Sequence, residues 1–252
     1  MNERKVALVT ASAGVGIGSA VAHRLASDGY DVVISDAHER RCKETADTFA
    51  REYGREFAAM PLDVSDHAAV ARVFDEIRTS FGRLDVLVNN AGWSKIERIV
   101  DMDVETWQRC VDIDLNGTFY CLQQGMRLMA EGNGGSIINL ASIAAWEMTD
   151  EHGAAYSAAK SGINALTRVA AYEGGPLGVR VNAVAPGLIY NDFLRKVYPD
   201  EFFDNYATDR SRVGRIGQPA DVSALIAFLV SDDAGYITGE TYGISGGVAP
   251  QA

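Results

Sequence analysis

The chain has 252 residues, of which 47% are hydrophobic and 23% are charged, and its formal net charge is −11. This composition excludes a disordered or fibrous chain, and the length is ordinary for one α/β domain. Because the excess negative charge repels polyanions, we expect no nucleic-acid partner.

The sequence carries no signal for a membrane or for export. The segment before residue 6 lacks the apolar core of a signal peptide, and no stretch reaches the ~20 apolar residues that a membrane span needs. The three cysteines are scattered, show no CxxC spacing and accompany no histidine cluster, so we expect reduced thiols and no metal site. We therefore expect a cytoplasmic protein.

Short apolar runs alternate with amphipathic segments along the whole chain. The runs cover 6–10, 31–35, 57–61, 85–89, 136–140, 179–184 and 241–245, and the helical patterns cover 16–27, 39–53, 66–81, 103–130, 154–172 and 219–229. Consecutive apolar positions are typical of strands buried on both faces. The alternation predicts one α/β domain over 1–252, with a doubly wound parallel sheet of about seven strands flanked by helices. Segment 188–213 breaks the rhythm and is expected to be a lid.

A glycine-rich loop follows the first predicted strand and precedes the first predicted helix. Glycines there let the backbone approach a ligand, and the helix N-terminus attracts a pyrophosphate. The candidate residues are Thr10, Ser12, Gly14, Gly16, Ile17 and Gly18. Asp36, 18 residues after Gly18, ends the second strand and suits the ribose hydroxyls of NAD. Arg40 and Arg41 leave NADP possible if one turns towards a 2′-phosphate; otherwise they belong to a solvated helical turn.

Two further strand ends carry residues that suit a dinucleotide. Asp63 and Val64 follow the third predicted strand, and Asn90 and Gly92 follow the fourth. Since ligands lie beyond the carboxyl ends of parallel strands, we expect these residues beside the cofactor. The alternative is that Asp63 caps the next helix and that the asparagines form a turn.

Tyr156 and Lys160 are four residues apart in a helical pattern and therefore project from one helix face. A phenol titrates near 10, and a neighbouring ammonium favours its ionised form, so the pair can act as an acid–base device. The alternative is an exposed helix with an extended lysine.

Taken in order, these motifs resemble the short-chain dehydrogenase/reductase family over essentially the whole chain. The glycine loop, residues 89–92, Ser142, the Tyr156–Lys160 pair and Pro186-Gly187 carry the resemblance. It implies a Rossmann fold and hydride transfer between a nicotinamide cofactor and a secondary alcohol or ketone. It also implies that Tyr156 exchanges the hydroxyl proton, that Lys160 assists it, and that Ser142 holds the substrate oxygen.

The chain departs from the family pattern at four places. Ala11 replaces the usual glycine and one extra residue precedes Gly16, so we expect a wider loop with Gly14 in the strained turn. Asp114 stands where the family has a catalytic asparagine, unless the helix shifts so that Asn116 takes that role. A carboxylate there would oppose ionisation of the tyrosine.

The other two departures concern the loops around the cofactor. Ser142 and Tyr156 are 14 residues apart, which predicts a larger loop beside the substrate. The usual threonine after Pro186-Gly187 is replaced by Asn191, so we expect Ile189, Asn191 and their backbone to bind the nicotinamide amide.

The segments that border substrate in the family are apolar and aromatic here, which favours a bulky hydrophobic or alicyclic substrate. The main candidates are Trp93, Trp146, Tyr190 and Phe193, and further aromatic or apolar candidates are Leu194, Tyr198, Phe202, Phe203 and Tyr206. Basic residues at 195, 196, 210, 212 and 215 either meet an anionic tail or are plain surface. His152 either lines the mouth of the site or has no role.

Three functions remain open from the sequence. The first is a dehydrogenase or reductase of a secondary alcohol or ketone, and the second is a 3-oxoacyl-thioester reductase. The third is a non-catalytic nucleotide-binding scaffold, because a fold does not fix a function. The resemblance further implies a homotetramer or homodimer built on the helices after the fourth and fifth predicted strands.

Overall fold

The computed structural model describes residues 4–147, 152–192, 194 and 198–250. Its described strands form one six-stranded sheet, all parallel, in the order β2-β1-β3-β4-β5-β6. The strands are β1 (Val6–Val9), β2 (Asp31–Ile34), β3 (Val86–Asn89), β4 (Gly135–Leu140), β5 (Val179–Pro186) and β6 (Thr241–Ile244). This arrangement confirms the predicted α/β fold with a doubly wound parallel sheet.

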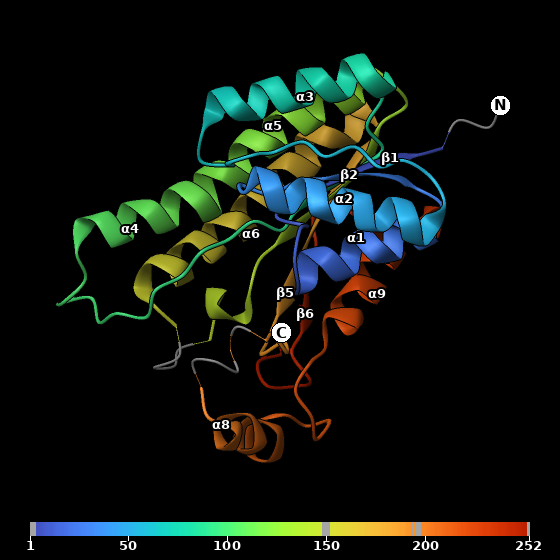
Figure 1. Ribbon diagram of the computed structural model, residues 1–252. Helices are drawn as coiled ribbons and strands as arrows, with labels where there is room; N and C mark the ends of the chain where they lie inside the picture. The colour runs from blue at the N-terminus through green and yellow to red at the C-terminus, as the bar shows by residue number, and fades with distance from the viewer. Residues whose placement is uncertain (1–3, 148–151, 193, 195–197, 251–252) are drawn as a thin grey trace.

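Helices cover both faces of the sheet (Figure 1). The α-helices are α1 (Ile17–Ser27), α2 (Glu39–Tyr53), α3 (His67–Phe81), α4 (Val104–Cys110), α5 (Gly117–Ala130), α6 (Ala154–Gly174), α8 (Asp200–Asn205) and α9 (Pro219–Val230). Shorter turns are η1 (Val111–Asn116), η2 (Ile143–Ala145), η3 (Gly175–Leu177), η4 (Tyr206–Arg210) and η5 (Asp232–Ala234). Among the described residues, no helix is long and apolar enough to cross a membrane.

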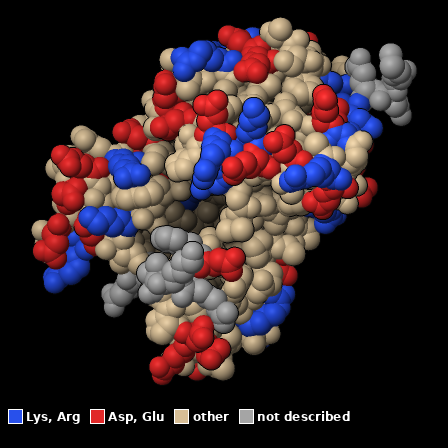
Figure 2. All heavy atoms as spheres, viewed as in Figure 1, with Lys and Arg blue, Asp and Glu red and all other residues tan. Residues whose placement is uncertain are grey.

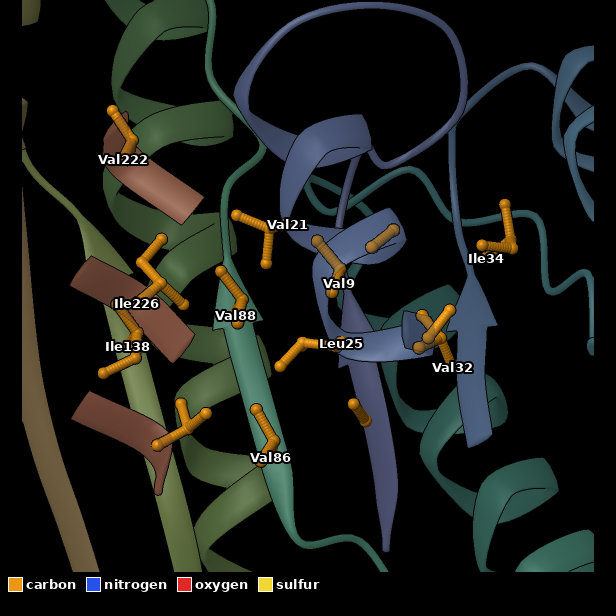
Figure 3. Close-up of a cluster of buried hydrophobic side chains, with 14 of the residues drawn as sticks. Val9, Val21, Leu25, Val32, Ile34, Val86, Val88, Ile138, Val222 and Ile226 are labelled. Carbon is orange, nitrogen blue, oxygen red and sulfur yellow. The ribbon is translucent and has the colours of Figure 1, made fainter. Parts of the chain in front are cut away.

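The strands are apolar at consecutive positions because each face of the sheet packs on helices. Val9 and Val88 join Val21 and Leu25 of α1 and Ile226 of α9 in one cluster, which Figure 3 shows. The neighbouring strand residues Leu8, Leu87 and Ile137 point the other way and pack with α3, α5 and α6. Side chains of adjacent strand residues alternate between faces, so two buried faces require an unbroken apolar run.

The sheet has six strands rather than about seven. The predicted strand at 57–61 runs parallel to β2 at the outer edge: Ile34 donates its N–H to Ala58, and Met60 donates to Ile34. Only Ala59 forms a bridge with Ile34, however. Backbone pairing continues past the end of β2, where Leu62 donates its N–H to the Asp36 carbonyl at 3.0 Å, but the bridge at Ala59 is isolated and the segment is not a regular strand.

The predicted helix at 103–130 is continuous but not uniform. It comprises α4, the π-helical stretch η1 and α5, with Asp103 capping its start by accepting the Thr106 N–H. The wider π-helical winding changes which side chains face the sheet, and it places Asp114, fully buried, on the inner side. Sequence periodicity does not distinguish such a stretch from an ordinary helix.

The strand order predicts a ligand site at the carboxyl ends of the strands. From β1 the chain moves outwards to β2 and later returns to β3 on the other side of β1, so the strand order reverses there. Open parallel sheets bind ligands beyond the carboxyl ends of their strands at such a reversal. The loops after β1, β3, β4 and β5 therefore define the region to search.

Candidate active site

A cleft of about 670 Å³ lies beyond the carboxyl ends of β1, β3, β4 and β5. Figure 2 shows the surface hollowed near the middle of the face drawn. Loops after four strands and the segment around α8 contribute the walls. The predicted site residues among the lining are Gly16, Ile17, Gly18, Asn90, Gly92, Trp93, Ser142, Tyr156, Lys160, Pro186, Gly187, Ile189, Tyr190 and Asn191.

The glycine-rich loop has the geometry of a phosphate cradle. Gly14 and Gly16 have φ of +106° and +110°, which favour glycine, and a Cβ on Gly18 would lie 2.4 Å from the Asn90 amide. No side chain caps the start of α1, so its first N–H groups remain available to an anion. The residues present therefore fit a dinucleotide pyrophosphate.

The expectation that Gly14 takes the strained turn is incomplete. Ala11 also has a positive φ, +51°, and is the one non-glycine residue of the described chain that does. An alanine pays a steric penalty of about 1–2 kcal/mol in this left-handed region, which glycine avoids. The loop thus holds a non-glycine residue in a backbone conformation that favours glycine.

Thr10 and Ser12 shape this loop from beneath and do not line the cleft. The Thr10 hydroxyl accepts N–H bonds from Asn90 and Ala91, at 2.9 and 3.0 Å. The Ser12 hydroxyl is fully buried, accepts from Ser35 N–H at 3.0 Å and donates to its carbonyl. Both hydroxyls link neighbouring strand ends by hydrogen bonds, and neither residue lines the cleft.

Asp36 lies two residues beyond the end of β2, close to the predicted strand tip, with only 3% of its surface exposed. Its Oδ1 accepts the His38 N–H at 2.9 Å and the Arg41 Nη2 at 2.6 Å. Arg41 therefore turns back over the loop, and its Cδ lies 3.6 Å from a Cβ built on Gly14. Of the two arginines, Arg41 is the one that pairs with Asp36 and lies beside the glycine loop.

Asp63 and Val64 do not reach the cleft. The Asp63 carboxylate accepts bonds from the backbone and hydroxyl of Ser65, which makes a local turn. Asp66, not Asp63, caps α3 by accepting the Ala68 and Ala69 N–H groups. Val64 is buried and packs against Gly117, where a Cβ would come within 2.7 Å of it. Both residues lie beside the segment that leaves β2, outside the cleft lining.

The loop after β5 approaches the glycine loop from the opposite wall. Pro186 ends β5, and Gly187 donates its N–H to Ile244 of β6. The Asn191 amide lies 3.6 Å from a Cβ built on Gly16. Asn191 thus lines the cleft and approaches the glycine loop from the opposite wall.

Buried amides fix α6, which carries the Tyr156–Lys160 pair, to the sheet. Asn89 at the end of β3 donates to Asn139 of β4 at 2.8 Å, and Asn139 donates to Thr167 of α6 at 2.9 Å. All three residues are almost fully buried. Because such bonds are strong and directional inside a protein, they set the height of α6 relative to the strand ends.

Lys160 makes a buried ion pair with Asp114. Its Nζ lies 3.0 Å from Asp114 Oδ1 and donates to the Leu140 carbonyl at 2.8 Å. The same ammonium lies 5.3 Å from the centre of the Tyr156 ring. The second carboxylate oxygen of Asp114 accepts the Trp93 N–H at 2.8 Å.

The ion pair decides the charge of the lysine. Burial by itself lowers the pKa of Lys160, but Asp114 and the Tyr156 phenol outweigh it, so the pKa lies above the ordinary 10.5. Lys160 is therefore an ammonium throughout the neutral range. Asn116 does not compete for this place: its amide donates to Asp112 at 2.8 Å, away from the lysine.

Ser142 starts the turn η2 directly after β4, and its hydroxyl accepts the Ala144 N–H at 3.2 Å. It lines the same cleft as Tyr156 and Lys160. The structure therefore brings Ser142, Tyr156, Lys160 and Asp114 together, although they come from three separate segments. Part of the enlarged loop between Ser142 and Tyr156, residues 148–151, lies outside the described residues.

Two of the four predicted substrate residues line the cleft, Trp93 and Tyr190. Trp146 does not. Its indole N–H donates to the Ala249 carbonyl at 3.0 Å, and its ring lies 3.8 Å from a Cβ built on Gly243. The C-terminal segment therefore holds Trp146 behind the wall. Phe193 lies outside the described residues, as do residues 195 and 196.

Several lining residues come from backbone that carries no motif. Ile96 and Leu188 face the cleft, and His152 also lines it, which selects the first of its two alternatives. Arg210 pairs with Glu147 and Arg215 with Asp221, so these two arginines have carboxylate partners. The apolar character of the loops predicted further lining residues. Four of them line the cleft, namely Leu194, Tyr198, Phe202 and Tyr206. Phe203 does not line it and is buried.

Comparisons with known proteins agree with this geometry. The family described as enoyl-(acyl carrier protein) reductase matches residues 11–249. A protein of Mycobacterium tuberculosis named (5R,7aS)-5-hydroxy-7a-methyl-1-oxo-2,3,5,6,7,7a-hexahydro-1H-indene-carboxyl-CoA reductase is 42% identical over 245 residues, covering 96% of this chain and 92% of that protein. The 3-oxoacyl-[acyl-carrier-protein] reductase FabG of Staphylococcus aureus is 36% identical, covering 98% and 99%.

Solved structures give the same result. A short-chain dehydrogenase of Mycobacterium smegmatis is 38% identical with a TM-score of 0.83, covering 99% of this chain and 93% of that one. A putative short-chain alcohol dehydrogenase of Sinorhizobium meliloti is 34% identical with a TM-score of 0.89, covering 97% and 96%. The fold and the cleft define a nicotinamide-dependent oxidoreductase that acts on a secondary alcohol or ketone. The chain belongs to the short-chain dehydrogenase/reductase family.

Because Asp114 carries a charge beside Lys160, we expect Asp114→Asn to change the pH dependence of alcohol oxidation. Without this charge the ammonium of Lys160 favours the Tyr156 phenolate unopposed, so the acid limb of alcohol oxidation moves to lower pH. Lys160 also loses one of the causes that raise its pKa, so the alkaline limb moves down as well. We expect the profile of kcat/KM against pH to shift to lower pH.

Asp112→Asn is the matched control, because Asp112 lies two residues away and bonds to Asn116 instead of Lys160. Its profile is expected to coincide with that of the unaltered protein. An Asp114→Asn profile that stays in place, or moves to higher pH, contradicts the electrostatic role given to this carboxylate.

Proposed function

We propose that this chain interconverts an alicyclic ketone and its secondary alcohol with NAD as cofactor. The observation that carries the proposal is one cleft that combines Ser142, Tyr156 and Lys160 with a phosphate cradle and apolar walls. The cradle suits the pyrophosphate, and the three polar side chains lie where the nicotinamide end would reach. The apolar walls exclude a strongly hydrated substrate such as a sugar.

The chemistry divides between the cofactor and the protein. Bound NAD(H) supplies or accepts the hydride. In reduction, the Tyr156 hydroxyl donates its proton to the substrate oxygen, and Ser142 donates a hydrogen bond that stabilises the negative charge on that oxygen. Lys160 keeps a positive charge beside the phenol, and Asp114 positions Lys160 through the 3.0 Å ion pair. In oxidation the proton moves in the opposite direction.

The apolar and aromatic lining of the cleft favours an alicyclic substrate. Trp93 and Ile96 form one wall, and Leu194, Tyr198 and Phe202 form another. Tyr198 and Phe202 stack at 4.5 Å between ring centres, which makes a flat apolar surface in the proposed lid over 188–213. The relative that is named for an indene-carboxyl-CoA substrate supports a fused-ring ketone.

A 3-oxoacyl-thioester reductase is the second candidate, supported by the likeness to FabG. The two candidates overlap if the ring system is carried as a thioester. Turnover of acetoacetyl thioesters without turnover of cyclic ketones would favour the second. A non-catalytic scaffold has no support, because the polar groups needed for proton transfer all line the cleft.

Tyr156→Phe separates an enzyme from a nucleotide-binding scaffold. The phenyl ring keeps the shape of the side chain but has no proton to exchange, so we expect turnover to fall by about 10²–10⁴. Cofactor binding, followed by thermal shift with NADH, is expected to persist. If the Tyr156→Phe variant still turns over substrate, followed by NADH absorbance at 340 nm, the role given to Tyr156 is wrong.

Asp36 supports NAD over NADP. Its buried carboxylate can accept both ribose hydroxyls and repels a 2′-phosphate, although Arg41 beside it offers a phosphate partner. We expect Asp36→Ser to lower kcat/KM with NAD(H) and to raise it with NADP(H), because Arg41 is then released from its carboxylate. Steady-state kinetics with both cofactors measure the change. A protein that already prefers NADP(H) before the substitution contradicts the assignment.

Exposed apolar side chains on α4, α5 and α6 support assembly into a homotetramer, with a homodimer as the alternative. Trp107, Phe119, Val169 and Tyr172 are 42%, 41%, 56% and 85% exposed. We expect light scattering after size exclusion to give about four times the chain mass of 27.1 kDa. A species of single-chain mass would contradict this proposal.

We further propose that the protein works in the cytoplasm. All three cysteines, Cys42, Cys110 and Cys121, are free and buried. Burial raises the pKa of each thiol, to about 11 or 12, so they are inert hydrophobic side chains. Unpaired thiols are typical of a reducing compartment.

A further inference from the structure

Arg109 is a cation that the proposed reaction leaves unused. It lies on α4, is exposed, and its guanidinium sits 4.6 Å from the ring centre of Trp93. Trp93 lines the cleft. A basic group therefore lies over a residue of the cleft lining, although Arg109 is not itself one of the lining residues.

The backbone of Trp93, whose ring lies beneath Arg109, is fixed by two hydrogen bonds. The Trp93 N–H donates to Asp114 at 2.8 Å, and the Trp93 carbonyl accepts from the Cys110 thiol at 3.3 Å. Because Asp114 also binds Lys160, the position of Trp93 is tied to the catalytic lysine. The stacked guanidinium is thus placed in a defined relation to the reacting end of the cleft.

Neighbouring cations are neutralised, whereas Arg109 is not. Lys95 pairs with Glu97 and Asp103, and Arg98 pairs with Asp101. Within the part of the chain that the structure describes, Arg109 has no carboxylate at ion-pair distance. Asp112, one turn further along, accepts from Asn116. In a chain of net charge −11, such a cation is a local attraction for an anion.

We infer that Arg109, supported by Trp93, binds an anionic group of the substrate at the cleft rim. The contact with the ring does not use the N–H donors of the guanidinium, whose planar arrangement matches a carboxylate or a phosphate. The inference rests on the proposed function and makes its substrate class more specific: an apolar ring or acyl body with a negative charge at one end. Arg109 acts on binding and not on proton transfer.

The test compares charged substrates with neutral counterparts of similar shape. One pair is a cyclic keto acid and its methyl ester, and the other is acetoacetyl-coenzyme A and acetoacetyl-N-acetylcysteamine. The first pair reports a carboxylate and the second reports the phosphates of coenzyme A. Arg109→Gln is expected to lower kcat/KM about 10–100-fold for the charged member of one pair, through KM, and to leave the neutral member unchanged.

Two variants serve as controls. Arg109→Lys keeps the charge and is expected to recover part of the loss, because lysine lacks the planar donor edge. Arg98→Gln removes a cation from the same side of the molecule, already paired with Asp101, and is expected to change neither pair. High salt should reduce the advantage of the charged substrate in the unaltered protein but not in Arg109→Gln.

The outcomes separate this inference from the proposed function. If neutral ketones are reduced but charged ones show no Arg109-dependent advantage, the anion site is wrong and the proposed function stands. An equal loss for charged and neutral substrates shows a structural role only and also overturns the site. If no ketone is reduced, the proposed function fails; calorimetric binding of coenzyme A at saturating NADH, compared between the unaltered protein and Arg109→Gln, then decides the anion site by itself.

Discussion

The buried pair of Lys160 and Asp114 is the interaction on which the site depends. Two charges withdrawn from water are costly unless each is closely paired and hydrogen-bonded. Here the ammonium is shared between Asp114 and the Leu140 carbonyl, and the other carboxylate oxygen takes a backbone N–H from Trp93. One pair therefore connects the helix with the acid–base residues, the end of β4 and the loop after β3.

This pair also changes how the family's chemistry is arranged. A lone ammonium beside a phenol would make the phenol more acidic, whereas a neutralised one exerts a weaker field. Asp114 also links Lys160 to the backbone of Trp93, a residue of the cleft lining. The π-helical stretch η1 is what delivers Asp114 to this position. Local helix winding and active-site charge are thus coupled.

Much of the fold could be predicted from sequence because its signals are local. Apolar runs bounded by glycine or polar residues located the strands, and α2 has the predicted bounds. The run at 57–61 was overrated because pairing depends on the length of β2, which lies elsewhere in the chain. For the site, motif order brought Ser142, Tyr156 and Lys160 together correctly. Asp63 and Trp146 do not line the cleft, and the sequence could not show this because Ser65 and the distant Ala249 hold their side chains.

The bond from the Trp146 indole to the Ala249 carbonyl has a practical consequence for handling the protein. The end of the chain is part of the scaffolding behind the substrate loop, and Gly246 also accepts the Arg212 N–H from the segment after η4. A purification tag or fusion partner joined at this end would pull on both loops. Fusions belong at the other end, where the chain enters β1 on the opposite side of the molecule from α8 (Figure 1).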